Sequence, residues 1–115
     1  MLKLSQICVD AREPSALGAW WAEVLGWPLR VDSDGDAFLT PPPGHGAELL
    51  FLGVPEDKVV KNRLHLDFTP EDQQAEFDRV LALGARRVDI GQGEQSWVVL
   101  ADPEGNEFCI LAADD

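Results

Sequence analysis

The sequence predicts an α+β domain built from two copies of a β-α-β-β-β unit. Two segments have helical periodicity, and eight short apolar segments, most of them separated by Gly, Pro or Asp turns, have the character of strands. Both helical segments end in Leu-Gly, at Leu25-Gly26 and Leu83-Gly84, so the two units repeat at an offset of about 58 residues. Each unit is too small to bury a sheet alone, and we expect the pair to share one cavity.

The helices are identified by an apolar face and by their terminal residues. In the first helix Pro14 suits the first turn and Gly26 suits a left-handed end. In the second, Thr69 is expected to cap the helix, Pro70 to be its first residue and Gly84 to end it. The apolar face of the first helix comprises Leu17, Trp20, Trp21, Val24 and Leu25.

The strands are expected near residues 3–9, 29–32, 36–40, 47–52, 64–68, 87–90, 96–101 and 107–111. Asp34-Gly35 is a tight-turn signal, and the Pro/Gly-rich residues 41–46 are expected to form a loop between two strands.

Length and charge restrict the partners of the chain. Its 115 residues fit one domain, with module one at about residues 1–55 and module two at about 62–115. The net charge of −12 disfavours nucleic acids and anionic membranes as partners. No apolar run approaches the roughly 18 residues of a membrane helix, and the first residues do not resemble a secretory signal. Two cysteines without a CxxC spacing then predict a cytoplasmic protein with reduced thiols.

Alternation along the strands places several polar side chains on faces turned away from the helices. Gln6, Glu48, His65 and Cys109 each come from a different strand and could converge. Glu, His and Cys are competent ligands for a borderline metal such as zinc. A strand histidine is, however, more often a structural hydrogen-bonding residue, so the residues alone leave both roles open.

Several segments together resemble the vicinal-oxygen-chelate superfamily, which includes glyoxalase I, extradiol dioxygenases and bleomycin-resistance proteins. They are the repeated unit, the Trp20-Trp21…Leu25-Gly26 helix end, the histidine of RLHLDF, and ADPEGNEFCIL near the C-terminus. Residues 54–68 resemble small bacterial glyoxalase-like domain proteins in particular. The resemblance implies two βαβββ modules whose sheets form an open barrel-like cleft, usually in a homodimer.

The resemblance also implies a divalent metal, such as zinc, nickel or iron, at four positions. These map onto Gln6, Glu48, His65 and Cys109. The last departs from the family pattern, which usually has Glu where this chain has Cys109. A metal-bound thiolate is a poor general base, so the expected catalytic carboxylates are Glu48 and Glu107, the latter on the same face as Cys109. An extradiol dioxygenase needs two His and one carboxylate, a pattern that Gln6 and Cys109 break.

Further residues are candidates for ligand contact. Arg63 follows Lys58 and Lys61 closely, and can bind an anionic group bidentately or simply belong to a charged loop. Asp67 shares the face of His65. Phe38 and Trp97 are expected in matching strands, where they either form an aromatic floor for a flat ligand or pack in the core.

Two functions follow from these expectations. The first is a metal-dependent lyase or isomerase resembling glyoxalase I, in which the metal acts as a Lewis acid on the oxygen atoms of a small molecule. The alternative is a non-catalytic binding or resistance protein that sequesters an aromatic or cationic compound. The acidic surface suits a cationic ligand, and the sequence names no substrate.

Overall fold

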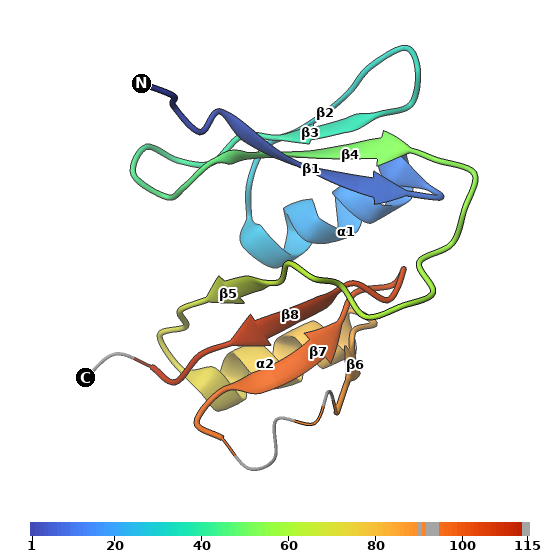
Figure 1. Cartoon of the computed structure of the whole chain (residues 1–115). Helices are drawn as coiled ribbons and strands as arrows, with labels where there is room; N and C mark the ends of the chain where they lie inside the picture. Colours follow the sequence, from blue (N-terminus) through green and yellow to red (C-terminus); the bar gives the residue numbers. More distant parts are fainter. Residues whose placement is uncertain (90, 92–94, 114–115) are drawn as a thin grey trace. The chain divides into compact units, whose positions relative to one another are not determined.

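The computed structural model describes residues 1–89, 91 and 95–113 and confirms the α+β class with two repeated modules (Figure 1). The chain forms two compact units, Met1–Asp57 and Lys58–Asp115, which we call module one and module two. Each contains a β-α-β-β-β series and its own open four-stranded mixed sheet. The elements in chain order are β1 (Gln6–Ala11), α1 (Pro14–Leu25), β2 (Leu29–Val31), β3 (Ala37–Leu39), β4 (Glu48–Gly53), β5 (Leu66–Phe68), α2 (Gln73–Ala82), β6 (Arg86–Arg87), β7 (Val98–Ala101) and β8 (Glu107–Ile110).

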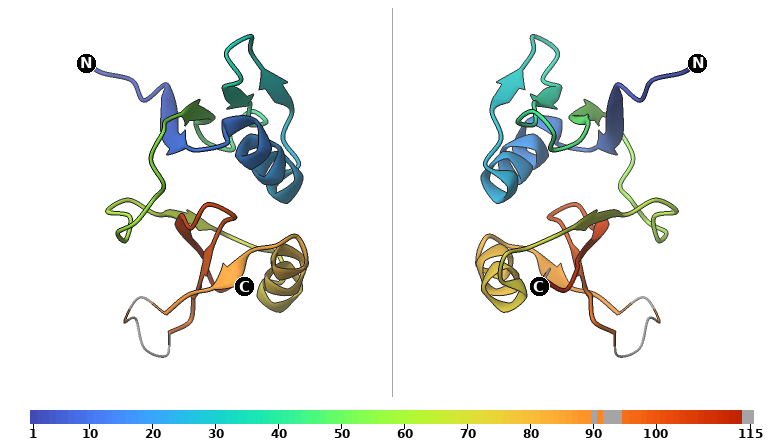
Figure 2. Two further views of the ribbon diagram at one scale, coloured as in Figure 1. Left: turned by 90° about the vertical axis from the view of Figure 1, so that its right-hand side faces the viewer. Right: turned by 90° about the vertical axis from the view of Figure 1, so that its left-hand side faces the viewer.

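Module one has the strand order β1-β4-β3-β2, in which β1 and β4 are parallel and the other pairs are antiparallel. Helix α1 lies along one face of this sheet (Figures 1 and 2). A Cβ added at Gly18 would lie 2.3 Å from the Cβ of Ala37 on β3, so the helix approaches the sheet closely there. The core of this module, which includes Leu17, Trp21 and Phe51, lies between the helix and that face.

The predicted ends of α1 are confirmed. Pro14 is the first helical residue, where its missing N–H costs nothing. Gly26 ends the helix in the left-handed conformation at φ 70°, and its N–H donates to the carbonyl of Ala22.

Module two repeats this plan with the strand order β5-β8-β7-β6. Helix α2 lies on one side of the sheet and contacts β8 (Figure 2). Phe108 and Leu100 are among the buried residues of this module. No helix in the described part of the chain is long and apolar enough to cross a bilayer.

The predicted start of α2 is wrong. The helix begins at Gln73 rather than at Pro70, and the cap is Asp72 rather than Thr69. The Asp72 carboxylate accepts the N–H of Ala75 at 3.0 Å, which satisfies one otherwise unpaired donor of the first turn. The Gln73 side chain also donates to the carbonyls of Ser96 and Ile110, so this start ties the helix to its sheet.

Several strands are shorter or shifted relative to the prediction. Strand β1 begins at Gln6, β5 begins only at Leu66, and β7 begins only at Val98. Leu64, predicted on the apolar face of β5, is instead 68% exposed, because it precedes the strand and does not follow its alternation. In the segment predicted at 87–90, β6 is Arg86–Arg87, and residue 90 lies outside the described residues.

Two hairpins are closed by the same five-residue turn. Residues 32–36 connect β2 to β3, and residues 102–106 connect β7 to β8. In each turn the first aspartate, Asp32 or Asp102, accepts the backbone N–H groups two and four residues later, at 2.9–3.0 Å. The fourth residue, Gly35 or Gly105, has a positive φ of 85° or 92°. The DPEGN motif is therefore a structural turn that connects β7 to β8.

Candidate metal centre

Module two brings three potential metal ligands together. Strands β5 and β8 pair in parallel with Asp67 opposite Cys109, and His65 lies directly before β5. The Nδ1 atom of His65 is 2.9 Å from a carboxylate oxygen of Asp67 and 3.8 Å from the Sγ atom of Cys109. The structure thus places the predicted ligands His65 and Cys109 side by side and adds Asp67 to them.

The three side chains differ in their exposure and protonation. Cys109 is buried, whereas the side chains of His65 and Asp67 are 42% and 44% exposed. Burial, with the hydrogen bond to Asp67 and its negative charge, raises the pKa of the Cys109 thiol to about 11, against a smaller lowering by Lys61. The thiol is therefore protonated at neutral pH unless a metal displaces its proton.

The donor set fits a borderline divalent metal. One nitrogen, one sulfur and one oxygen atom of the three residues lie within 4.8 Å of one another. On a tetrahedral zinc ion, a nitrogen at ~2.0 Å and a sulfur at ~2.3 Å lie about 3.5 Å apart. The 3.8 Å between His65 and Cys109 is close to that separation. Imidazole, thiolate and carboxylate are also the ligand types that zinc accepts.

Gln6 and Glu48, the other predicted ligands, form a pair within module one. They are register partners at the start of the parallel strands β1 and β4, so their side chains leave the same face of the sheet. That face is the one opposite α1. Phe51 lies three residues after Glu48 on β4 and so on the other face, and both Phe51 and its register partner Ala37 lie under Gly18 of the helix. Gln6 is exposed and Glu48 half-buried.

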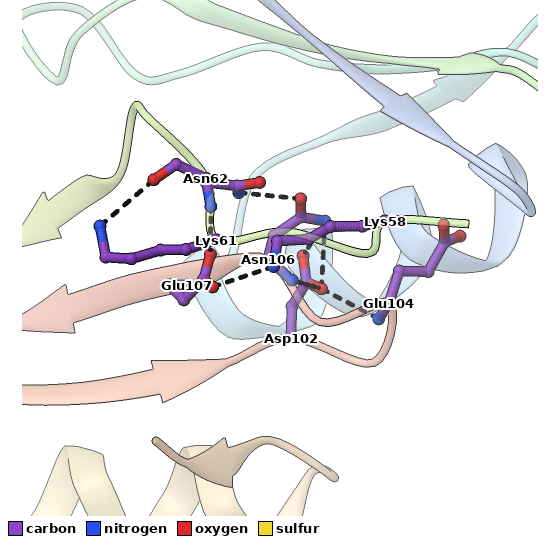
Figure 3. A network of polar contacts seen from close by, with 7 residues as sticks. All are labelled: Lys58, Lys61, Asn62, Asp102, Glu104, Asn106 and Glu107. Atoms are coloured by element: carbon purple, nitrogen blue, oxygen red, sulfur yellow. Dashed lines mark hydrogen bonds and ion pairs between the residues drawn. The ribbon is translucent and has the colours of Figure 1, made fainter. Parts of the chain in front are cut away.

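Glu107 has a different environment from the other candidates (Figure 3). Its carboxylate is only 9% exposed, and it accepts a hydrogen bond from the Lys58 ammonium at 2.9 Å and one from the Asn62 backbone N–H at 3.0 Å. The Asn62 side chain in turn donates to Asn106 of the 102–106 turn at 3.0 Å. Glu107 thereby anchors residues 58–62 to the beginning of β8.

The pKa of Glu107 follows from these contacts. Burial by itself would raise the pKa, but the hydrogen bonds from Lys58 and from the Asn62 backbone outweigh it. They hold the pKa below its ordinary value of 4.5, so the carboxylate is ionised at neutral pH with its partners in place.

The remaining candidates lie in three places. Arg63 is exposed in a bend two residues before His65. Trp97 is half-buried and precedes β7 by one residue, so its predicted position inside that strand is wrong. Phe38 is half-buried in β3 as expected, but the guanidinium of Arg30 lies 4.1 Å from the centre of its ring.

Sequence reasoning assigned Asp67 to ligand contact only and did not single out Arg30. The His-x-Asp spacing was the available signal for Asp67, because residues two apart on a strand share a face. The signal for Arg30 was the pairing of β2 with β3, which depends on the length of the turn between them.

Known proteins share this fold. FosX, a fosfomycin resistance protein from Listeria monocytogenes solved with Mn(II) and sulfate, aligns with a TM-score of 0.74 and 15% identity over 99% of this chain and 92% of that one. A protein of Agrobacterium tumefaciens solved by NMR aligns over all of both chains with a TM-score of 0.76 and 17% identity. The oxidase ChaP-H2 covers 98% of this chain and 94% of its own, with a TM-score of 0.70 and 18% identity.

No curated protein matches the chain. The family model described as "Glyoxalase-like domain" matches residues 6–111, which include every strand and both helices. The match confirms the resemblance to the vicinal-oxygen-chelate superfamily that the sequence motifs indicated. The chain therefore belongs to the glyoxalase-like domain family.

Proposed function

We propose that this protein binds a small molecule at a divalent metal and acts on it as a lyase or isomerase of the glyoxalase type. The cluster of His65, Asp67 and Cys109 carries the proposal, since three ligand-type atoms lie within 4.8 Å of one another. FosX, which shares the fold, was solved with Mn(II), and this supports a metal in the family. A thiolate and an imidazole favour zinc over manganese here, with nickel and iron as the other candidates.

The proposal takes Gln6 and Glu48 as further ligands of the same metal, on the strength of the family resemblance. Their pairing across β1 and β4 supports it, because it puts an amide and a carboxylate next to each other on one sheet face. A substitution of Glu48 should therefore weaken metal binding, as substitutions of the ligands of module two should.

Glu48 is the proposed general base. Among the residues that the structure describes, its carboxylate has no hydrogen-bond or ion-pair partner, so it is available to take a proton from a ligand. Glu107, the second candidate, already holds Lys58 and Asn62. When bound, a divalent metal supplies Lewis-acid stabilisation of negative charge on a ligand oxygen.

The alternative function is sequestration of a small molecule without chemistry. The Cys109 position favours it, because a thiol stands where the family usually has a carboxylate, and Glu107 has its own partners. In that function the polar strand residues supply hydrogen bonds only. A homodimer and a cytoplasmic location remain predictions from the sequence, and light scattering of the purified protein tests the first.

The test is the metal content of the purified protein, measured by elemental analysis without chelators and after addition of zinc. We expect about one zinc per chain in the wild type and a loss of at least tenfold in affinity for His65→Ala and Cys109→Ser. Glu48→Gln should also weaken binding. His45→Ala is the matched control, since His45 lies in the exposed Pro/Gly-rich loop, and should bind zinc like the wild type.

Circular dichroism of each variant separates loss of metal from loss of fold. A folded wild type that takes up no zinc, nickel or iron would end the metal proposal and favour sequestration. Equal loss in His45→Ala and His65→Ala would show that the zinc is bound elsewhere.

A further inference from the structure

Arg30 shares a sheet face with the proposed ligands of module one. The register pairs Arg30 with Phe38, Phe38 with Leu50, and Leu50 with Cys8, so these four side chains form a row across the sheet. Gln6 and Glu48 lie one step along β1 and β4 on that same face, the one that α1 leaves uncovered.

The distance from Glu48 to this arginine suits one small molecule. Two strand spacings of ~4.8 Å and two residues of ~3.4 Å put the Cα atoms of Glu48 and Arg30 about 12 Å apart. The guanidinium does not point away from Glu48, because it lies above the ring of Phe38, on the strand between β2 and β4. A ligand of a few carbon atoms that lies against Glu48 can therefore extend to the guanidinium.

The guanidinium is held in place but is not neutralised. Its carbon lies 4.1 Å from the Phe38 ring centre, within the range of a cation–π contact. Among the described residues no carboxylate lies within 4 Å of it, although the chain has 21 acidic residues and only nine Lys and Arg. Stacking leaves the N–H groups at the edge of the plane free to donate.

We propose that Arg30, held against Phe38, binds an oxyanion group of the small molecule, either a carboxylate or a phosphonate. The planar fork of arginine matches both groups bidentately. Arg30 is the one cation among the described strand residues of this face, which also carries the carboxylates of Asp10 and Glu48. Among these residues Arg30 is therefore the one that can attract an oxyanion. An anionic ligand would meet repulsion elsewhere on a chain of net charge −12.

This inference rests on the proposed function because it names the class of molecule that this function would act on. It does not require the metal, so the two are tested separately. The second module offers a matched control, Arg87, whose guanidinium also lies over a phenylalanine, at 5.9 Å from the ring centre of Phe77.

The test is an NMR titration of uniformly labelled protein at constant ionic strength. Affinity is measured in every variant from the backbone amide signals, and the Arg30 Nε–Hε signal is followed as well wherever Arg30 is present. The probes are benzoate, phenylphosphonate and benzamide, the last being neutral and close to benzoate in shape. Each is added to zinc-loaded and to chelator-treated protein, and zinc content is measured on the same samples. The variants are Arg30→Gln, Arg30→Lys, Phe38→Leu and Arg87→Gln, each checked for folding by its amide spectrum.

We expect at least one acid to shift the Arg30 signal saturably and benzamide to bind at least tenfold more weakly. Arg30→Gln should weaken acid binding about ten- to a hundredfold, and Arg30→Lys less, since it keeps the charge but loses the fork. Phe38→Leu should weaken it about two- to fivefold, because the arginine loses its support. Arg87→Gln should change it less than twofold.

The proposal is overturned if neither acid binds in either sample, if benzamide binds as well as benzoate, or if Arg30→Gln binds like the wild type. Equal losses in the Arg30 and Arg87 variants would also overturn it. Acid binding at Arg30 by a protein that takes up no zinc would support the oxyanion site and refute the metal proposal alone.

Discussion

Replacing Glu107 with Gln distinguishes an anchoring carboxylate from a catalytic one. Its carboxylate holds the Lys58 ammonium and the Asn62 backbone N–H, and it is 9% exposed, while the Lys58 side chain is 19% exposed. A Gln side chain keeps one oxygen acceptor but turns an NH2 group toward one of these two donors. The substitution therefore leaves one donor without a partner and Lys58 without its counter-charge.

The loss of stability caused by Glu107→Gln can be estimated from these contacts. A hydrogen bond to a charged group contributes about 1.5–3 kcal/mol, and breaking a fully buried ion pair costs about 3–5 kcal/mol. Because Lys58 keeps some access to water, we expect Glu107→Gln to lower the free energy of unfolding by about 2 kcal/mol at pH 7. Urea unfolding followed by tryptophan fluorescence measures it, since the chain has four tryptophans.

Glu76→Gln is the matched control. Glu76 pairs with Arg79 at 2.6 Å, but both side chains are well exposed, at 39% and 44%. Its loss should cost less than about 1 kcal/mol. Equal costs for the two variants, or an unchanged stability in Glu107→Gln, would refute the anchoring role.

The effect should also depend on pH with a defined sign. The pKa of Glu107 in the folded protein is below its ordinary value of 4.5, so the charged form stabilises the fold above that value. This stabilisation is lost as the pH falls through the folded pKa. The difference between wild type and Glu107→Gln should therefore be constant well above pH 4.5 and shrink below it.

Three further predictions concern local packing, capping and thiol chemistry. Gly18→Ala should lower the free energy of unfolding by about 1–3 kcal/mol despite the better helix propensity of Ala, because the new Cβ would lie 2.3 Å from that of Ala37. Asp72→Ala should cost about 1 kcal/mol in urea unfolding, since α2 loses its cap. Without metal, a thiol reagent at pH 8 should modify the exposed Cys8 quickly and Cys109, whose pKa is about 11, only on unfolding.

Each of these predictions has a control. Adding Ala37→Gly to Gly18→Ala should cost less than the sum of the two single changes, and full additivity would refute the contact. Thr69→Ala should cost less than Asp72→Ala, because Thr69 does not cap the helix. Two fast thiols in the folded protein would contradict the burial of Cys109.

The parts of the fold that were predicted correctly depend on local signals. Helix α1 begins at Pro14 and ends before Gly26, because each of these residues acts through its own backbone preference. The start of α2 could not be predicted so well, since Thr69 and Asp72 are both competent caps. The start at Gln73 allows the side chain of this residue to donate hydrogen bonds to two carbonyls that lie 23 and 37 residues away in sequence. Contacts at such separations cannot be seen in the local sequence.

In the candidate site, too, the contacts that depend on local signals could be predicted and those that depend on the pairing of strands could not. Strand alternation was enough to group His65 with Asp67, which the structure places 2.9 Å apart. The pairing of Arg30 with Phe38 could be predicted only from the length of the turn between β2 and β3. A two-residue turn at Asp34-Gly35 would have paired Arg30 with Leu39, whereas the five-residue turn shifts the register by one and pairs it with Phe38.

The repeated turn has a consequence for how the chain folds. Its hydrogen bonds span at most four residues, so it can form early, before any distant strands meet. In module one it joins β2 and β3, at the edge of the sheet, whereas in module two it joins β7 and β8, with β8 at the centre beside β5. Two modules with the same final plan are therefore expected to assemble in different orders, one inward from an edge and one outward from its middle.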